Sequence, residues 1–417
     1  MGVYINVLFR DLVKDIKSTT YATHSLYMYP AKFIPQVIRY AISRYTDEGD
    51  WIFDPFAGYG SVAIEASLTG RNAILWDLNP ITRILALAST YKGDLSLKDF
   101  ELDWDYVKPF IPRWDHIDYW HPPEFLKTLS RVWGYWHNEV HGKVEDSKAY
   151  LIAIPLLKVT RFFSYSDEKI AKLYRSKYAE EKVKGLLSRD WRRLMVEKYW
   201  EHAKKVLRDI EDYQSLKPKN IKIIVEASWR DGNRLSIIDS LNKSLNMRIK
   251  LMITSPPYLQ AQEYIRSFKL ELSWLGYSGS DLRMLSSKEI PYNTPPNVRV
   301  ESEKYWRIRG EVERLKHPKL LKLYDAYFKS LAHFLNNNHK MIEDTIAMFV
   351  GPVKIRNIRV PIDEILKEHL ESLGWKHEAT LIDTIVARRL FRAEENPATG
   401  LEDERTPTEH LLIMRKT

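Results

Sequence analysis

A glycine-containing turn, DPFAGYGS, follows a short apolar run and occupies residues 54–61. Gly58 and Gly60 carry no side chain, so the backbone of this turn can pass close to a ligand. Such a turn between a strand and a helix is typical of a pocket for a nucleotide-like molecule. A G-x-G turn also serves tight packing in many α/β proteins, and the turn alone therefore indicates a pocket only weakly.

Two aspartates stand where they can complete such a pocket. Asp77 follows the second expected strand, where a carboxylate can accept hydrogen bonds from both hydroxyls of a ribose. The alternative for Asp77 is an N-cap of the helix that begins near Pro80. Asp231 lies in the turn after the third expected strand and can accept a hydrogen bond from an adenine amino group. The alternative for Asp231 is a solvated turn residue.

The motif TSPPY, residues 254–258, follows another apolar run. Two consecutive prolines fix the backbone, so that a side-chain oxygen and a carbonyl can converge on one point. The nitrogen of an aromatic amine has its lone pair delocalised into the ring, and a reaction there needs acceptors for its protons. The Ser255 oxygen and the Pro256 carbonyl suit that role, and Tyr258 can stack on a base. Taken alone, Pro256 and Pro257 can also simply end a strand.

The elements that must position these motifs follow an α/β pattern. The region from Trp51 to Ala88 reads as strand, glycine turn, helix and strand, which predicts a parallel sheet with helices on both faces. Later apolar runs complete a seven-stranded mixed sheet, and the seven stretches, some with the turn that ends the strand, are 51–56, 71–80, 220–228, 247–258, 344–351, 379–387 and 408–416. Residues 282–314 are polar and contain three prolines, so we expect a long loop there.

Composition narrows the class of protein further. The 417 residues carry a net charge of +9 and no cysteine, so disulfides, thiolate catalysis and cysteine-ligated zinc are excluded. The basic balance suits a polyanionic partner, although a basic surface without one is equally compatible with it. The histidines have no recognised metal-binding spacing, so we expect no metal. No apolar run is long enough to cross a bilayer, and we expect a cytoplasmic protein with no membrane partner.

Together with HSLYMYPAKF at residues 24–33 and WDLNP at 76–80, these motifs resemble the amino-methylating DNA methyltransferase family. The resemblance covers residues 20–90 and 220–417, and its last segment looks like the closing strand hairpin of that family. It implies an α/β, Rossmann-like S-adenosylmethionine-dependent methyltransferase fold, with S-adenosylmethionine as the cofactor. The order of the motifs, with the cofactor motifs first and a long insertion between, departs from many cytosine-N4 enzymes.

The motifs supply two sets of candidate site residues. The catalytic loop implied by the resemblance is Ser255, Pro256, Pro257 and Tyr258. The candidate cofactor-binding residues are Tyr29, Pro30, Ala31, Lys32, Phe33, Asp54, Pro55, Phe56, Ala57, Gly58, Gly60, Asp77 and Asp231. We therefore expect 1–91 to be the cofactor-binding first half of the methyltransferase domain and 220–417 to be its catalytic second half.

Between these halves, residues 92–219 form a helical, basic insertion that is rich in aromatic residues. Lysines and arginines suit phosphates and aromatic rings suit unstacked bases, so we expect the insertion to recognise the target. Solvated helix faces are the alternative for any single residue. The candidate nucleic-acid-binding residues are Arg161, Lys169, Lys172, Arg175, Arg192 and, in the expected loop after TSPPY, Arg283.

Ser255 bears on the target base. In the family that the chain resembles, Ser at this position tends to mark cytosine-N4 enzymes, whereas Asp or Asn tends to mark adenine-N6 enzymes. The resemblance therefore implies methylation of cytosine N4 in double-stranded DNA by base flipping, within a restriction-modification system that has a cognate restriction endonuclease. The alternatives are adenine-N6 methylation, base methylation of RNA, and a nucleic-acid-binding protein without catalysis.

Overall fold

The computed structural model describes residues 2–168, 170, 172–227, 248–259, 264–290, 295–384 and 408–417. The strands of the main sheet are β1 (Val3–Val7), β2 (Trp51–Asp54), β3 (Asn72–Trp76), β4 (Ile223–Glu226), β5 (Ile249–Thr254), β6 (Ile342–Val350), β9 (Trp375–Thr384) and β10 (Thr408–Lys416). Two short strands, β7 (Val353–Ile355) and β8 (Ile358–Val360), form a separate antiparallel pair.

The described helices fall into three groups along the chain. Those of the first part are α1 (Phe9–Leu12), η1 (Ala22–Ser25), α2 (Pro35–Tyr45), α3 (Ser61–Thr69) and α4 (Ile81–Ser89). Those of the insertion are η2 (Leu97–Phe100), α5 (Ile117–Trp120), α6 (Pro123–Tyr135), η3 (Trp136–Val140), α7 (Asp146–Phe162), α8 (Lys177–Leu187) and α9 (Trp191–Ser215). Those of the last part are α11 (Tyr264–Ser267), α12 (Lys269–Trp274), α13 (Gly279–Ser287), α14 (Glu303–Arg314), α15 (Pro318–Asn338), η4 (His339–Met341) and α16 (Ile362–Ser372).

The main sheet runs in the order β1-β9-β10-β6-β5-β2-β3-β4. Its pairs are parallel except for β10, which is antiparallel to both β6 and β9. The α/β, Rossmann-like fold predicted from the sequence is confirmed, and all seven expected strands form. The predicted number of strands is too low by one, because β1 adds a parallel edge strand beside β9. Most of its side chains are exposed, so it has no buried face to produce an alternating pattern.

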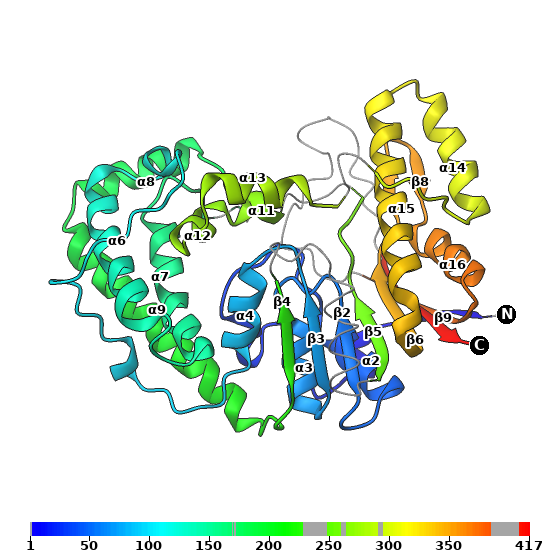
Figure 1. The fold of residues 1–417 in the computed structure, drawn as a ribbon, viewed down its shortest axis with the longest axis horizontal. Helices are drawn as coiled ribbons and strands as arrows, with labels where there is room; N and C mark the ends of the chain where they lie inside the picture. The colour runs from blue at the N-terminus through cyan, green and yellow to red at the C-terminus, as the bar shows by residue number, and fades with distance from the viewer. Residues whose placement is uncertain are drawn as a thin grey trace.

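Alternation along the strands divides the core into two layers. Ile52 and Leu251 face one side of the sheet and pack against α2 and α3, whereas Phe53 and Met252 face the other side and pack against α15 and α16. Figure 1 shows α14, α15 and α16 grouped beyond β5 and the helical insertion beyond β4. The strands that carry the motifs therefore lie in the middle of the molecule.

The helical insertion has a core of its own, and it shares that core with α12 and α13. Phe268, Leu272, Trp274 and Leu282 pack into the same apolar cluster as residues of α6, α7 and α9. We call this body, made of residues 97–215 and 264–287, the helical lobe. The predicted division into 1–91, 92–219 and 220–417 remains a prediction, and the packing adds a second stretch of chain to the insertion. Figure 1 shows α11–α13 above the sheet, between the insertion and the centre.

The long loop predicted for 282–314 is wrong over most of the stretch that the structure describes. Helices α13 and α14 occupy much of it. Ser278 begins α13 with a capping box that Asp281 completes, and the Ser302 side chain caps α14. The charged residues that made the stretch look like a loop lie on the exposed faces of these helices. Among the described residues, no helix has the length and apolar character needed to span a membrane.

Candidate active site

Three neighbouring strands bring the sequence motifs to one edge of the sheet. Asp54 ends β2, Asp77 follows β3 and Ser255 follows β5, and the sheet order places β5, β2 and β3 side by side. The carboxyl ends of parallel strands are the usual ligand-binding edge of such sheets. A cavity of about 520 Å³ lies there and is lined by Asp77, Gly58 and Ser255 together with residues of α11 and α15 and residues 288–290, which follow α13.

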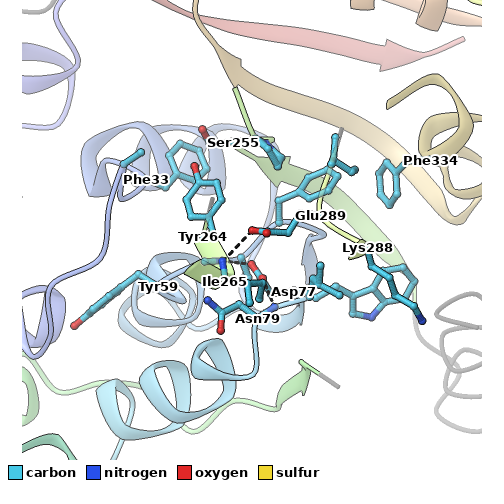
Figure 2. A pocket seen from close by; sticks show the side chains of 18 of the residues that line it. Phe33, Tyr59, Asp77, Asn79, Ser255, Tyr264, Ile265, Lys288, Glu289 and Phe334 are labelled. Atoms are coloured by element: carbon cyan, nitrogen blue, oxygen red, sulfur yellow. Dashed lines mark hydrogen bonds between the residues drawn. The ribbon is translucent and has the colours of Figure 1, made fainter. Parts of the chain in front are cut away.

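Asp77 is held in the cavity by two backbone donors. Its Oδ2 accepts from the Gly58 nitrogen at 2.7 Å and its Oδ1 accepts from the Asn79 nitrogen at 2.7 Å. Helix α4 begins after Pro80, so Asp77 fixes the turn before the helix and does not occupy the N-cap itself. Each carboxylate oxygen has a second lone pair, so the same group can also accept from a ligand. Figure 2 shows Asp77 and Asn79 on one side of the cavity and Ser255 on the other.

The two glycines of the first motif have different tasks. Gly58 lines the cavity with φ at +51°, and a Cβ there would lie 3.0 Å from the Tyr29 ring. Gly60 has φ at +86°, and its Cβ would lie 2.7 Å from the Ala86 Cβ. Gly60 therefore allows α3 and α4 to approach each other, whereas Gly58 keeps the cavity wall flat next to Tyr29.

Asp54 links the glycine turn to the catalytic loop through two hydrogen bonds. Its Oδ1 accepts from the Thr254 hydroxyl at 2.7 Å and from the Phe56 nitrogen at 3.2 Å. The side chain is 1% exposed and does not line the cavity. Burial raises the pKa of Asp54 to about 7, against hydrogen bonds from Thr254 and Phe56 that favour the charged form.

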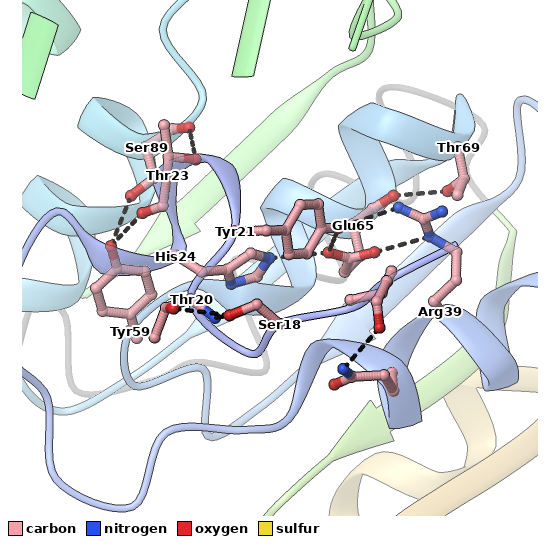
Figure 3. Close-up of polar contacts among 12 residues, drawn as sticks. Ser18, Thr20, Tyr21, Thr23, His24, Arg39, Tyr59, Glu65, Thr69 and Ser89 are labelled. Atoms are coloured by element: carbon pink, nitrogen blue, oxygen red, sulfur yellow. Dashed lines mark hydrogen bonds and ion pairs between the residues drawn. The ribbon is translucent and has the colours of Figure 1, made fainter. Parts of the chain in front are cut away.

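Residues 22–33 are tied to the sheet domain by a buried polar cluster (Figure 3). The His24 Nε2 lies 2.8 Å from Oε1 of Glu65 on α3, and both side chains are fully buried. Arg39 donates from Nε to the second oxygen of Glu65 at 2.8 Å, and Tyr21 donates its hydroxyl to Glu65. Burial lowers the pKa of His24, so its ring is neutral and presents one N–H to the Glu65 carboxylate.

This anchored segment delivers side chains to the cavity. Tyr29, Ala31, Lys32 and Phe33 line it. Lys32 donates to the His24 carbonyl, and burial lowers the pKa of its ammonium to about 8. At pH 7 this group still carries a positive charge beside the cavity.

The catalytic loop meets the cavity through Ser255 and Pro257. Tyr258 does not line the cavity, and its hydroxyl donates to Oε1 of Glu409 on β10 at 2.7 Å. Burial and the neighbouring Glu409 raise the pKa of Tyr258 well above its usual value, so the phenol stays protonated and remains a donor. Glu409 therefore holds the end of the loop against the sheet.

The cavity gathers many of the residues singled out in the sequence and adds others. Those that line it are Tyr29, Ala31, Lys32, Phe33, Phe56, Ala57, Gly58, Asp77, Ser255 and Pro257. Those that do not line it are Pro30, Asp54, Pro55, Gly60, Pro256 and Tyr258. Asp231 lies outside the described residues. Lining residues that sequence reasoning missed include Tyr264, Ile265, Lys288, Glu289 and Phe334. They belong to no motif, and no pattern in the chain marks them.

Glu289 is the most notable of the missed residues, because it adds a second carboxylate to the cavity wall. Its Oε1 accepts from the Ile265 nitrogen at 2.9 Å, which joins the end of α13 to the start of α11 (Figure 2). Burial, with added repulsion from Asp77 and Glu289, raises the pKa of Tyr264. The ring of Tyr264 stacks on Tyr29 at a centroid distance of 6.1 Å. Residues 264–265 and 288–290 therefore form one wall of the cavity, which we call its roof.

The candidate nucleic-acid-binding residues differ in how far the structure buries their side chains. The assignment of Arg161 to DNA is wrong, because its side chain is 8% exposed and forms an ion pair with Glu271 at 2.7 Å. Arg175 stacks between the rings of Tyr119 and Tyr165 at 4.7 and 3.9 Å and pairs with Glu180. Arg192 lies over the Trp191 ring, and Lys172 and Arg283 are exposed. Lys169 lies outside the described residues.

Comparison with known proteins agrees with the site. A family model described as DNA methylase, of the N6 and N4 type, matches residues 9–86, which include the polar cluster, the glycine turn and Asp77. These matches support the amino-methylating DNA methyltransferase family for this chain. No solved structure gives a significant match.

Three curated proteins show how far the likeness to this family extends. Type II methyltransferase M.BsoBI of Geobacillus stearothermophilus is 21% identical, over 67% of this chain and 58% of that protein. Type II methyltransferase M.MvaI of Kocuria varians is 21% identical, over 96% of this chain and 92% of that protein. Type II methyltransferase M.MjaII of Methanocaldococcus jannaschii is 35% identical, over 22% of this chain and 18% of that protein.

S-adenosylmethionine is the methyl donor of this family, and the cavity fits it in size and chemistry. Its volume lies in the range of sites for small molecules and cofactors. Asp77 offers carboxylate oxygens to ribose hydroxyls, and Gly58 leaves the wall free of a side chain beside Tyr29. Lys32 supplies a positive charge that can face the carboxylate of the methionine part.

Proposed function

We propose that this protein methylates the exocyclic N4 of cytosine in double-stranded DNA. The observation that carries the proposal is that Ser255 lines the same cavity as Asp77 and Gly58. A loop that begins with Ser, rather than with Asp or Asn, favours cytosine within the amino-methylating family. Adenine N6 and RNA bases are the alternative targets.

The cofactor, when bound, supplies a methyl group activated by a sulfonium. In the proposal, Asp77 holds the ribose, and Tyr29, Lys32 and Phe33 close one side around the methionine part. The sandwich of Tyr29 between Tyr264 and Phe268, with ring centroids at 6.1 and 5.2 Å, keeps that side rigid. Rigid positioning of both reactants contributes more to such a reaction than a strong base does.

At the catalytic loop, the chain supplies hydrogen-bond acceptors for the amino group of the target base. The Ser255 oxygen and the Pro256 carbonyl would accept from the amino group as its nitrogen loses conjugation with the ring. Asp54 and Thr254 fix the start of this loop, and Glu409 fixes its end through Tyr258. Tyr258 would offer its ring face to the base while its hydroxyl stays on Glu409. The target base would leave the duplex, since its amino group is otherwise engaged in pairing.

The partners follow from the same reasoning. Exposed Lys172, Arg192 and Arg283 of the helical lobe would contact phosphates of double-stranded DNA. The relatives M.BsoBI and M.MvaI are Type II methyltransferases, which supports a role in a restriction-modification system with a cognate endonuclease.

The test is the identity of the modified nucleoside. The protein is incubated with S-adenosylmethionine and unmethylated phage DNA, and in parallel with total RNA, before nucleoside mass spectrometry. N4-methylcytosine from DNA is the expected product. N6-methyladenine would overturn the inference from Ser255, and methylated nucleosides from RNA alone would overturn the DNA substrate.

A further inference from the structure

Three distant segments of the chain meet at a buried junction. The Tyr27 hydroxyl donates to Oε1 of Glu271 at 2.9 Å, and Arg161 Nη1 donates to the same oxygen at 2.7 Å. Arg161 Nη1 also donates to the Ser267 carbonyl at 3.1 Å. Tyr27 belongs to the anchored segment 22–33, Arg161 to α7 of the insertion, and Glu271 to α12. We call these three residues the lobe junction.

The lobe junction is a costly way to hold helices together. The side chains of Glu271 and Arg161 are 1% and 8% exposed, and an ion pair taken out of water adds little stability over well-packed apolar residues. Glu271 Oε2 is buried and has no hydrogen-bond partner in the described part of the chain. The arrangement therefore calls for a function besides stability, and directional hydrogen bonds give a defined geometry that apolar packing does not.

The geometry set by the lobe junction reaches the cavity through aromatic rings. Phe268 stands directly before α12, which carries Glu271, and its ring stacks on Tyr29 at 5.2 Å and lies 6.4 Å from the Tyr27 ring. Tyr29 in turn lies against Gly58 and Tyr264 in the cavity wall. A shift of α12 relative to residue 27 would therefore move Tyr29 and the roof of the cavity.

We propose that Glu271 is a positioning residue that couples the helical lobe to the cofactor pocket. Glu271 fixes the position of the Tyr29 ring through Tyr27 and Phe268. Because Arg161 on α7 is bonded to Glu271, the position of Tyr29 also depends on the position of the helical lobe. A ligand that moves or steadies the lobe then changes the affinity for S-adenosylmethionine, and S-adenosylmethionine changes the affinity for that ligand by the same factor. The identity of that ligand as DNA rests on the proposed function, whereas the effect on the pocket does not.

The variant Tyr27→Phe tests the positioning role with little disturbance, because it removes one hydroxyl and keeps the ring. The dissociation constant for S-adenosylmethionine, measured by calorimetry without DNA, is expected to rise about tenfold, the effect of losing one hydrogen bond to a charged group. The matched control is Tyr213→Phe. Tyr213 is also a buried tyrosine, and it joins the insertion to α3 through a 2.5 Å hydrogen bond with Ser67, away from the cavity. It should change thermal stability and leave cofactor affinity unchanged.

The coupling is tested with Glu271→Gln, measured with and without duplex DNA. In the wild type, we expect DNA to tighten cofactor binding, and in Glu271→Gln this tightening should be lost. Unchanged cofactor affinity in Tyr27→Phe, with a loss of stability like that of Tyr213→Phe, would overturn the proposal. Should Glu271→Gln fail to fold, Tyr27→Phe measured with DNA decides the coupling. A wild type that binds S-adenosylmethionine but methylates no DNA would contradict the proposed function alone.

Discussion

At the scale of single residues, Asp54 is the point where the two sequence motifs touch. Its Oδ1 accepts from the Thr254 hydroxyl, one residue before Ser255. The two motifs were predictable as separate local patterns, as were Asp77 and Ser255, because their residue types and spacing carry the chemistry. The hydrogen bond between Thr254 and Asp54 was not predictable, because nothing in a sequence fixes which side chains meet across two strands. The same limit applies to Glu289, which reaches the cavity from the end of α13.

Asp54 makes stability depend on pH. Burial raises its pKa from 3.8 to about 7, so the folded chain holds a proton there that the unfolded chain has lost. This contribution is full below pH 3.8 and disappears as the pH rises through about 7. Asp54→Asn keeps an acceptor for Thr254 and removes the titration. Urea unfolding from pH 5 to 8 should show the variant gaining stability relative to the wild type, and parallel curves would contradict the assignment.

Tyr258 and Glu409 allow a second test at this scale. If Glu409 acts by orienting Tyr258, removing either partner of the 2.7 Å hydrogen bond should have the same effect. Tyr258→Phe and Glu409→Gln should each lower kcat for methyl transfer about tenfold, with cofactor affinity unchanged, because a charged hydrogen bond is lost or weakened. The double variant should be no slower than Tyr258→Phe. Additive losses would mean that Glu409 acts independently of Tyr258.

At the scale of elements, the glycine turn and an exposed helix give opposite predictions for the same substitution. Gly60→Ala should destabilise the fold by at least about 1–2 kcal/mol, because φ is +86° and the new Cβ would overlap Ala86. Gly185→Ala, inside α8 with open space around it, should stabilise by about 0.5–1 kcal/mol. Thermal unfolding of both variants measures the difference. A stable Gly60→Ala would show that α3 and α4 do not need this close approach.

The elements also show which part of the fold a sequence can predict. Most of the seven expected strands are buried on one or both faces, and burial imposes apolar residues, whereas the edge strand β4 buries only Val225. Strand β1 is an exposed edge, and α13 and α14 bury only narrow apolar stripes such as Tyr305, Ile308 and Val312. Their polar composition therefore concealed them. Arg161 was misassigned for a related reason, since a charged residue in a basic helix gives no sign of a buried partner 110 residues away.

At the scale of the whole molecule, the helical lobe and the sheet domain pack together. We expect DNA to bind at the helical lobe. Arg283→Ala should weaken DNA binding and reduce the slope of log Kd against log salt concentration by about 0.9, the effect of one phosphate contact. Arg44→Ala, an exposed arginine on α2, is the matched control and should leave the slope unchanged. Binding titrations at several salt concentrations measure this slope for both variants. Equal effects of the two variants on the slope would show that the DNA does not bind at the helical lobe.

The central claim is that the cavity between Asp77 and Ser255 joins cofactor binding to methyl transfer. Its most direct test is transfer of labelled methyl groups from S-adenosylmethionine to unmethylated DNA by the wild type, Ser255→Ala and Asp77→Ala, with the exposed Ser43→Ala as control. We expect Ser255→Ala to lose about 100-fold in rate with cofactor affinity kept, and Asp77→Ala to lose cofactor affinity. Transfer by Ser255→Ala at the rate of the wild type would contradict the account.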